Sequence, residues 1–364
     1  MLDKIILLTL TAFSLGSLGQ IFRESGVNLY LFDLVVLGAN LYLLLFFLKK
    51  KHFYTNSPLM FFLFFGLFLF VVTLVQGGNL GFWLRIVLYF GFSYFVYNLL
   101  YYKYLSFEVL KKLLIYNFYW VFLLSILQYF FFPDISFMES FGYDPHSSRL
   151  VGTFLDPNFW GFYLVIYIFL NEFYLKNRHL TIIALLLVFL TGSRSAFLVL
   201  SLLIIFLYFI NTKKALLLTF LIVLFFGYSS LPQRFEQTST ANDSLALRYE
   251  SWNSALQIYQ ASPYFGIGIG NYKNYLIGLN LIKPENYNQN SNNYSDSSLL
   301  SVLVFGGILG LILYLIFLLS YARNFKNLVF LILVLVNSLI INSLFFPGLA
   351  VLIFLTLNLG MLEN

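Results

Sequence analysis

Long apolar runs separated by short polar breaks fill the chain from end to end. Between the breaks lie twelve segments that approach the length of a membrane-spanning helix. They cover residues 5–22, 27–48, 58–76, 80–100, 111–132, 157–175, 180–191, 195–210, 215–231, 298–320, 326–346 and 348–361. Segments buried in lipid must satisfy their own backbone hydrogen bonds, and these runs lack the alternation of barrel strands. The pattern predicts an all-α polytopic membrane protein with about twelve transmembrane helices.

The composition excludes most other classes of protein. Of the 364 residues, 60% are hydrophobic and only 10% are charged, whereas a soluble domain carries about 25% charged residues. The absence of cysteine excludes a disulfide scaffold, and the apolar content excludes a disordered chain. We therefore expect a single integral membrane domain over residues 1–364.

The positions of the charges predict the orientation. If the N-terminus is cytoplasmic and the segments alternate, thirteen Lys and Arg residues lie inside, seven lie outside and Arg85 lies within a span. This distribution satisfies the positive-inside rule, so both termini are expected in the cytoplasm. The same orientation leaves two long loops outside, at 133–156 and 232–297, and long loops usually carry function or are disordered.

Arg85 and Asp33 are charged residues that lie several residues inside predicted spans. An arginine at membrane depth costs a few kcal/mol or more, which makes Arg85 a candidate for substrate binding. The alternative is an arginine that snorkels to the nearby outer interface. Asp33, in the second span, either pairs with Arg85 or caps a helix.

The seventh segment is too short to cross a membrane fully. About 12 residues span about 18 Å, against about 30 Å of hydrocarbon, so the turn at 191–195 is expected below the outer surface. Gly192 suits a helix end, and Ser193 or Ser195 suits the next helix start. Arg194 would then add its charge to a helix N-terminus, which already favours anions. This arrangement predicts a phosphate site; the alternative is an ordinary hairpin.

The second long loop contains a predicted amphipathic helix at residues 244–262. Its apolar face is formed by Leu245, Trp252, Ala255, Leu256 and Tyr259 at helical spacing. Arg248 lies one turn before Trp252, as a substrate-binding candidate or as a solvated residue of an interfacial helix. A glycine-rich turn follows at 263–271, where the backbone is expected to approach another element closely.

Other candidates lie at the loop ends. Asp296 precedes the tenth segment, where it suits both a helix N-cap and a base that accepts a hydroxyl proton. Asp156 followed by Pro157 is typical of a helix start. In the first long loop, His146 and Arg149 are candidates for substrate binding, with His146 the reserve base. Histidines on opposite faces form no metal-ligand cluster, so we expect no metal.

Four segments, in this order, resemble the bacterial O-antigen polymerase and O-antigen ligase family of membrane proteins (the Wzy and WaaL type). They are GTFLDPN at 152–158, TGSRSA at 191–196, the spaced residues Arg248, Trp252, Pro263, Gly266 and Gly268, and Ser297 to Leu311 with FGGILGL. The resemblance covers nearly the whole chain by topology, and by motif it is concentrated in residues 152–310.

The resemblance implies transfer of a glycan from an undecaprenyl pyrophosphate carrier, at the outer face of the bacterial inner membrane. It implies that Arg194 and Arg248 bind the donor pyrophosphate. Beside these two, Arg85, Arg149, Trp252 and His146 are our further candidates for contacts to the pyrophosphate or glycan. It also implies that the residue ending the large loop, here Asp296, activates the acceptor hydroxyl. The sugar pyrophosphate is already activated, so no cofactor is expected. The implied partners are the lipid-linked glycan, the bilayer and a protein that regulates chain length; nucleic acid is not one.

Departures from the family pattern favour one of its two activities. Ligases typically carry a His-Asn pair where this chain has Ser295-Asp296, and no histidine follows His179. We therefore expect a polymerase of lipid-linked repeat units, in O-antigen or capsule synthesis, rather than a ligase that transfers glycan to lipid A–core. Some polymerases have an Arg followed eleven residues later by Gly, and this chain lacks that pattern. A transporter of lipid-linked glycan is a third alternative, but internal repeats and charges at the membrane midplane are missing.

Overall fold

A computed structural model describes residues 1–24, 27–210, 238–282, 290–346 and 348–363. The chain is 76% helical, which confirms that it is nearly all-α. The helices of the first half are α1 (Leu2–Ser14), α2 (Leu31–Lys50), α3 (Ser57–Val75), α4 (Leu80–Tyr101), α5 (Phe107–Phe131) and α6 (Pro157–Leu170), which continues as a π-turn over Asn171–Leu175. Those of the second half are α7 (Arg178–Thr191), α8 (Arg194–Ile210), α10 (Thr238–Tyr259), α11 (Tyr272–Gly278), α12 (Ser298–Leu319), α13 (Phe325–Ile340) and α14 (Leu349–Gly360).

Eleven of the twelve predicted segments coincide with helices, and the remaining one, 215–231, lies outside the described residues. Five helices are long and apolar enough to cross a membrane, namely α2, α3, α4, α5 and α12. Further apolar helices are shorter, among them α13 and α14. The protein is therefore a multi-pass membrane protein, while the count of twelve spans stays a prediction.

The first predicted span is wrong at its C-terminal end. Helix α1 stops at Ser14, and a hairpin of β1 (Gln20–Glu24) and β2 (Val27–Tyr30) follows, with Gln20 paired to Tyr30. Gly16 has a left-handed φ of 49°, and a Cβ there would lie 2.6 Å from the carbonyl oxygen of Thr153. The helix ends because the chain must turn at this close contact. The sequence predicted a longer span because the residues after the turn, including those of β1, are also largely apolar.

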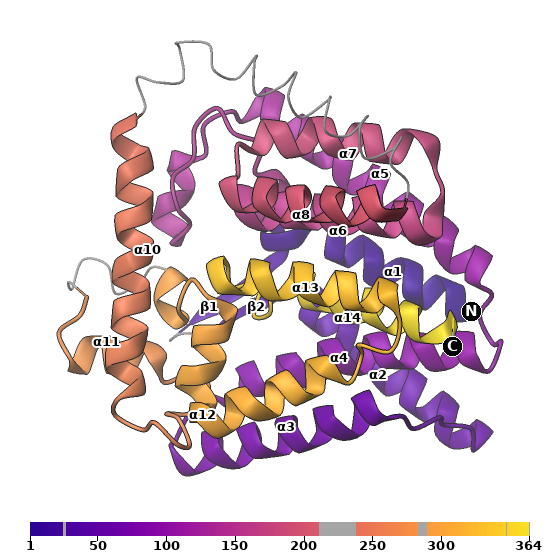
Figure 1. Ribbon diagram of the computed structural model, residues 1–364, viewed down its shortest axis with the longest axis horizontal. Helices are drawn as coiled ribbons and strands as arrows, with labels where there is room; N and C mark the ends of the chain where they lie inside the picture. Colours follow the sequence, from indigo (N-terminus) through magenta and orange to yellow (C-terminus); the bar gives the residue numbers. More distant parts are fainter. Residues whose placement is uncertain (25–26, 211–237, 283–289, 347, 364) are drawn as a thin grey trace.

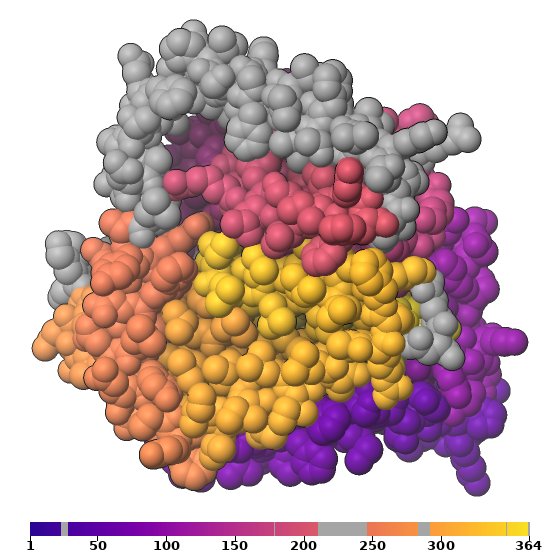
Figure 2. Space-filling view, viewed as in Figure 1, coloured from indigo at the N-terminus to yellow at the C-terminus, as the bar shows by residue number. Residues whose placement is uncertain are grey.

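The helices lie roughly side by side, and the two ends of this bundle differ (Figure 1). Helices α10 and α11 and the hairpin lie at one end, whereas both chain termini lie at the other. This arrangement places both termini on the same side, opposite the large loop. Helix α13 contacts both α8 and α12, and the face in Figure 2 shows it between them.

Helix α12 is broken at Gly307, and the glycine-rich turn of the large loop fills the break. Gly307 has φ 62° and ψ −166°, which frees four backbone groups of the helix. The carbonyls of Val304 and Phe305 accept hydrogen bonds from the amides of Ile267 and Gly268 at 3.0 Å each. In return, the amides of residues 308 and 309 donate to the carbonyls of residues 263 and 264, at 2.9 and 3.3 Å. The predicted close approach of this turn to another element is confirmed.

The contact requires glycine at position 266. Gly266 has φ +77°, and a Cβ would lie 2.4 Å from the carbonyl group of Phe305. We expect Gly266→Ala to lower the free energy of unfolding by at least about 1–3 kcal/mol, the usual cost of such a strained backbone. The measurement is thermal or denaturant unfolding of the purified protein in detergent.

Gly278→Ala is the matched control, since a Cβ at Gly278 would have no atom within 4 Å. Equal stability of the two variants would contradict the proposed role of the turn.

Candidate functional site

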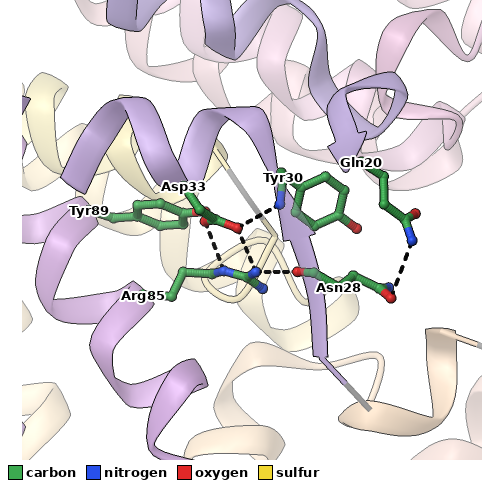
Figure 3. Close-up of polar contacts among 6 residues, drawn as sticks. All are labelled: Gln20, Asn28, Tyr30, Asp33, Arg85 and Tyr89. Carbon is green, nitrogen blue, oxygen red and sulfur yellow. Dashed lines mark hydrogen bonds and ion pairs between the residues drawn. The ribbon is translucent and has the colours of Figure 1, made fainter. Parts of the chain in front are cut away.

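Asp33 and Arg85 form a buried ion pair that joins α2 to α4 (Figure 3). The Arg85 Nε donates to one Asp33 oxygen at 3.0 Å and its Nη2 to the other at 2.6 Å. The Asp33 carboxylate also accepts from the Tyr30 amide at 3.0 Å, which caps α2, and from the Tyr89 hydroxyl. The Arg85 side chain is only 11% exposed, so the interpretation as a snorkelling residue is wrong. Both predicted roles of Asp33, pairing and capping, are confirmed.

The break between α7 and α8 has the predicted local structure. Gly192 ends α7 in a left-handed conformation with φ 58°. The Ser193 hydroxyl caps α8 by accepting from the Ala196 amide at 3.3 Å, and it also donates to Asn158 Oδ1 at 2.9 Å. Arg194 is the first residue of α8, and its side chain is exposed. A cation therefore stands at a helix N-terminus, where free amides favour an anion.

The first long loop brings a second arginine to this break. The Arg149 Nε donates to the carbonyl oxygen of Thr191 at 2.8 Å, and the neighbouring Leu150 amide donates to Leu190 at 2.9 Å. Arg149 and Arg194 therefore flank the same turn although they lie in different segments of the sequence. Their proximity makes this turn the cationic part of the candidate site.

Helix α10 confirms the predicted amphipathic helix in the large loop, but its buried face differs. Ala255 and Ile258 are fully buried, on a helix that packs against α12. Leu256, assigned to the apolar face from sequence, is instead 45% exposed, and the side chain of Leu245 lies outside the described residues. The face is rotated toward Ile258 because the contact with α12 selects the buried positions.

Arg248 and Trp252 are half-buried on α10. The Trp252 Nε1 is shielded from solvent and has no acceptor within the described ranges. The positive charge of Arg248 lowers the pKa of the Asp296 carboxyl, so the two groups lie within electrostatic reach of each other. Helix α10 thus holds a cation and an indole donor near the end of the large loop.

Asp296 is not the N-cap of α12, contrary to that interpretation of the sequence. The cap is Ser297, whose hydroxyl accepts from the Leu300 amide at 3.2 Å. The Asp296 amide donates to Ser251 Oγ of α10 at 3.1 Å, whereas its carboxylate has no hydrogen bond to the described part of the chain. Burial, opposed by Arg248 and aided by Asp156, raises the pKa of Asp296 to about 6. A half-buried carboxylate with this pKa suits proton acceptance near neutral pH.

Hydrogen bonds from buried polar side chains hold the backbone on both sides of Asp296. Asn342 Nδ2 donates to the carbonyl oxygen of Ser295 at 2.8 Å and to Ser301 Oγ at 2.9 Å. The Ser297 hydroxyl donates to the carbonyl oxygen of Ser338 at 2.8 Å. The end of α13 and the chain after it therefore fix the position of Asp296 from the side opposite α10.

The first long loop contributes acidic and imidazole groups near the same place. Loss of hydration on burial raises the pKa of Asp144 to about 6, and the negative charges of Asp156, Asp296 and Glu139 act in the same direction. Burial, with some effect from Arg149, lowers the pKa of His146, and its Nε2 is shielded without a partner in the described ranges. Asp156 caps α6 as predicted, since its carboxylate accepts from the amides of residues 158 and 159 at 2.6 and 3.1 Å.

Sequence reasoning missed Asp144 and Tyr294 as members of this neighbourhood. Tyr294 lies near Asp296 in sequence, and its pKa is raised by burial and by the charges of Asp156 and Asp296. The one sign in the sequence that these two residues could belong to the site was their position in the two long loops. Among the described residues no group of three or more His, Asp or Glu side chains is arranged to hold a metal ion.

The candidate residues form two groups, the arginines at the helix break and the carboxylate of Asp296 with Arg248. Arg149 and Arg194 flank the helix break, and Arg248 faces Asp296 from α10. Such an arrangement suits an anion that lies beside a hydroxyl group in need of a base. The structure leaves the predicted substrate contacts of Arg85, Arg149, Trp252 and His146 as predictions.

One comparison with known proteins finds a family that is similar to this part of the chain. A family model described as O-Antigen ligase matches residues 179–315, from α7 into α12, which include the helix break, α10, the glycine-rich turn and Asp296. No curated protein matches the chain significantly. Over this segment the chain is similar to the O-Antigen ligase family, which supports the resemblance found in the sequence.

Proposed function

We propose that the protein is a polymerase that joins oligosaccharide repeat units carried on a polyprenyl pyrophosphate. The match of residues 179–315 to the O-Antigen ligase family supports a glycosyl-transferring enzyme in a bacterial membrane. The observation that carries the proposal is Asp296, which ends the large loop within electrostatic reach of Arg248, has a raised pKa, and makes no carboxylate hydrogen bond to the described residues. The site faces the outer side of the membrane, and both termini are cytoplasmic.

The arginines bind the donor pyrophosphate. Guanidinium groups form planar, paired hydrogen bonds with phosphate oxygens, and they stay charged at all relevant pH values. Arg194 adds its charge to the free amides at the start of α8, and Arg149 lies at the same turn. Arg248 approaches from α10 and links this anion site to Asp296. The polyprenyl chain lies in the bilayer, so no nucleotide or other cofactor takes part.

The reaction exchanges one bond to the anomeric carbon for another. The oxygen of the acceptor hydroxyl forms a bond to that carbon, and its proton passes to the Asp296 carboxylate. The bond between the anomeric carbon and the phosphate oxygen breaks, and its electron pair leaves with the polyprenyl pyrophosphate. Arginines held in place before the reaction stabilise this developing negative charge.

A ligase is the second candidate, because the matching family model carries that description. A ligase would transfer the same glycan to lipid A–core instead of to another repeat unit. The Ser295-Asp296 pair, in place of the His-Asn pair typical of ligases, supports the polymerase.

Deletion of the gene distinguishes these activities when the surface glycan is resolved by size. Loss of a polymerase leaves a single repeat unit on the acceptor, whereas loss of a ligase leaves long chains on the carrier. Loss of a transporter would trap the unit inside the cell. A normal size ladder in the deletion strain would refute the polymerase.

Substitution of the arginines tests the pyrophosphate site. We expect Arg194→Ala and Arg248→Ala each to lower polymer formation by at least about a hundredfold, since charge-assisted bonds contribute about 1.5–3 kcal/mol each. Arg248→Lys should restore little, because an ammonium does not reproduce a paired contact. The measurement is polymer length in the complemented deletion strain at equal protein level.

Lys273→Ala is the control, since it removes another cation of the large loop, on α11. An arginine whose alanine variant matches this control in activity has no role in binding the pyrophosphate.

The raised pKa of Asp296 predicts a pH dependence. A base acts deprotonated, so the rate should be constant above about pH 6 and fall about tenfold per pH unit below it. Burial sets most of this midpoint; the charge of Arg248 lowers it, and the charges of Asp156 and Asp144 act in the opposite direction. The measurement is initial rate against pH in reconstituted membranes.

Asp296→Asn should abolish the reaction while leaving the fold intact, because the amide retains the size of the side chain but accepts no proton. A wild-type rate that is flat from pH 5 to 7, or an active Asp296→Asn variant, would remove Asp296 as the base.

A further inference from the structure

The turn between α2 and α3 lies at the end of the bundle opposite the large loop. Helix α3 fixes its place, because the last turn of that helix lies against the glycine-rich turn, where the Ile269 amide donates to the Thr73 hydroxyl at 3.1 Å. The 19 residues of α3 span about 28 Å, close to the thickness of the hydrocarbon. The turn before α3, at residues 51–56, is therefore expected near the opposite membrane surface.

His52 joins this turn to the one between α4 and α5, at residues 102–106. Its ring is stacked on those of Tyr102 and Tyr104, with centroid distances of 5.2 and 6.3 Å. Its Nδ1 also lies 2.8 Å from the Tyr104 hydroxyl, so a hydrogen bond joins the same two rings. These contacts hold the two turns side by side.

The stacked rings gather lysines from both turns on one surface. Lys51 immediately precedes the stacked histidine, and Lys103 lies between the two tyrosines. The Lys50 ammonium lies 5.7 Å from the centroid of one of those tyrosine rings, within the range of a cation–π contact. The turns and the helix ends beside them, residues 49–57 and 101–106, contain four lysines and no Asp or Glu.

These four lysines have no carboxylate partner among the described residues. The ion pairs within that part of the chain join Met1 to Asp3 and Arg85 to Asp33, and neither includes one of the lysines. All four lysines are exposed. Like charges gathered without a counter-ion repel one another, and an anion bound among them relieves the repulsion. The surface therefore favours an anionic ligand.

A stripe of exposed leucines on α2 leads to the same turn. Leu41, Leu45 and Leu48 follow one another at helical spacing and are 54%, 66% and 63% exposed. They lie on a helix long and apolar enough to cross a membrane, so lipid acyl chains are expected to cover them. The stripe ends at Leu48, and Lys51 and His52 follow it three and four residues later. A ligand that covers both parts carries an anionic group next to an apolar chain.

We infer that the surface formed by residues 49–53 and 101–104 binds the phosphate headgroup of an anionic phospholipid. The headgroup lies against the lysines, and an acyl chain lies along the leucine stripe. A zwitterionic lipid carries its own ammonium group beside the phosphate, so the lysines select a lipid that lacks one, such as phosphatidylglycerol. The inference goes beyond the proposed function and does not depend on it, since this surface lies at the opposite end from the large loop.

The lipids that the full chain retains test this surface. The protein is reconstituted with equal parts of phosphatidylglycerol and phosphatidylcholine and transferred to detergent, and the bound lipids are counted by native mass spectrometry. We expect the wild type to retain phosphatidylglycerol in preference. The double variant Lys51→Gln with Lys103→Gln should lose about fivefold of that preference for each lysine removed, the usual contribution of a lysine near an anionic surface.

The double variant Lys111→Gln with Lys112→Gln is the matched control. It also removes two cations, from the first turns of α5, at the same end of the bundle but outside both turns. The control should retain phosphatidylglycerol as the wild type does. Equal losses in the two double variants would show a diffuse attraction to the whole basic end and would overturn the site, as would an unchanged preference in the Lys51 and Lys103 variant.

Thermal unfolding in detergent separates a lipid from a soluble phosphate. Phosphatidylglycerol should raise the Tm of the wild type by several degrees, whereas glycerol phosphate, the same anion without acyl chains, should not. Without lipid, the Lys51 and Lys103 variant should have the wild-type Tm, which shows that it folds, and it should gain less from phosphatidylglycerol. An equal gain from glycerol phosphate would overturn the lipid as the ligand, and an equal gain in the variant would overturn the role of the lysines.

Discussion

The constraint that governs this structure is that backbone groups inside a membrane protein must find partners where a helix is interrupted. Helix α12 breaks at Gly307, and four of its backbone groups bond to the turn at residues 263–268. The turn belongs to the large loop, so the hydrogen bonds that satisfy the broken helix also attach the loop to the bundle. The position of α10 follows from this attachment, because the turn comes directly after that helix.

The charged residues of the site are placed mainly by backbone contacts of this kind. Ser251 on α10 accepts a hydrogen bond from the amide of Asp296, and Asn342 donates to the carbonyl beside it. Arg149 is fixed by the carbonyl of Thr191 at the helix break. Because these contacts use backbone groups, they fix the chain on both sides of Asp296 without engaging its carboxylate.

The sequence predicted features that depend on neighbouring residues. The apolar runs located eleven helices, Gly192 and Ser193 located the helix break, and the glycines at 266 and 268 located a close backbone contact. It did not predict the hairpin after Ser14, because the chain turns there against the distant carbonyl group of Thr153. Nor did it predict Ser297 as the cap of α12, because that residue is held by a hydrogen bond to Ser338 of α13. It also missed the proximity of Asp144 to Asp296, since the two loops meet only after the bundle has folded.

The buried Asp33–Arg85 pair is better explained by the elements that it holds in place than by a contribution to the stability of the fold. Removing two charges from water is costly, and a buried pair often stabilises a fold no more than apolar residues of similar size would. This pair instead satisfies groups from three elements, since it caps α2, bonds to α4 and holds the hairpin at Asn28. An apolar pair would fill the same volume but would leave the hairpin without a fixed register. In a chain with so few charges, this buried pair therefore connects the bundle to its loops.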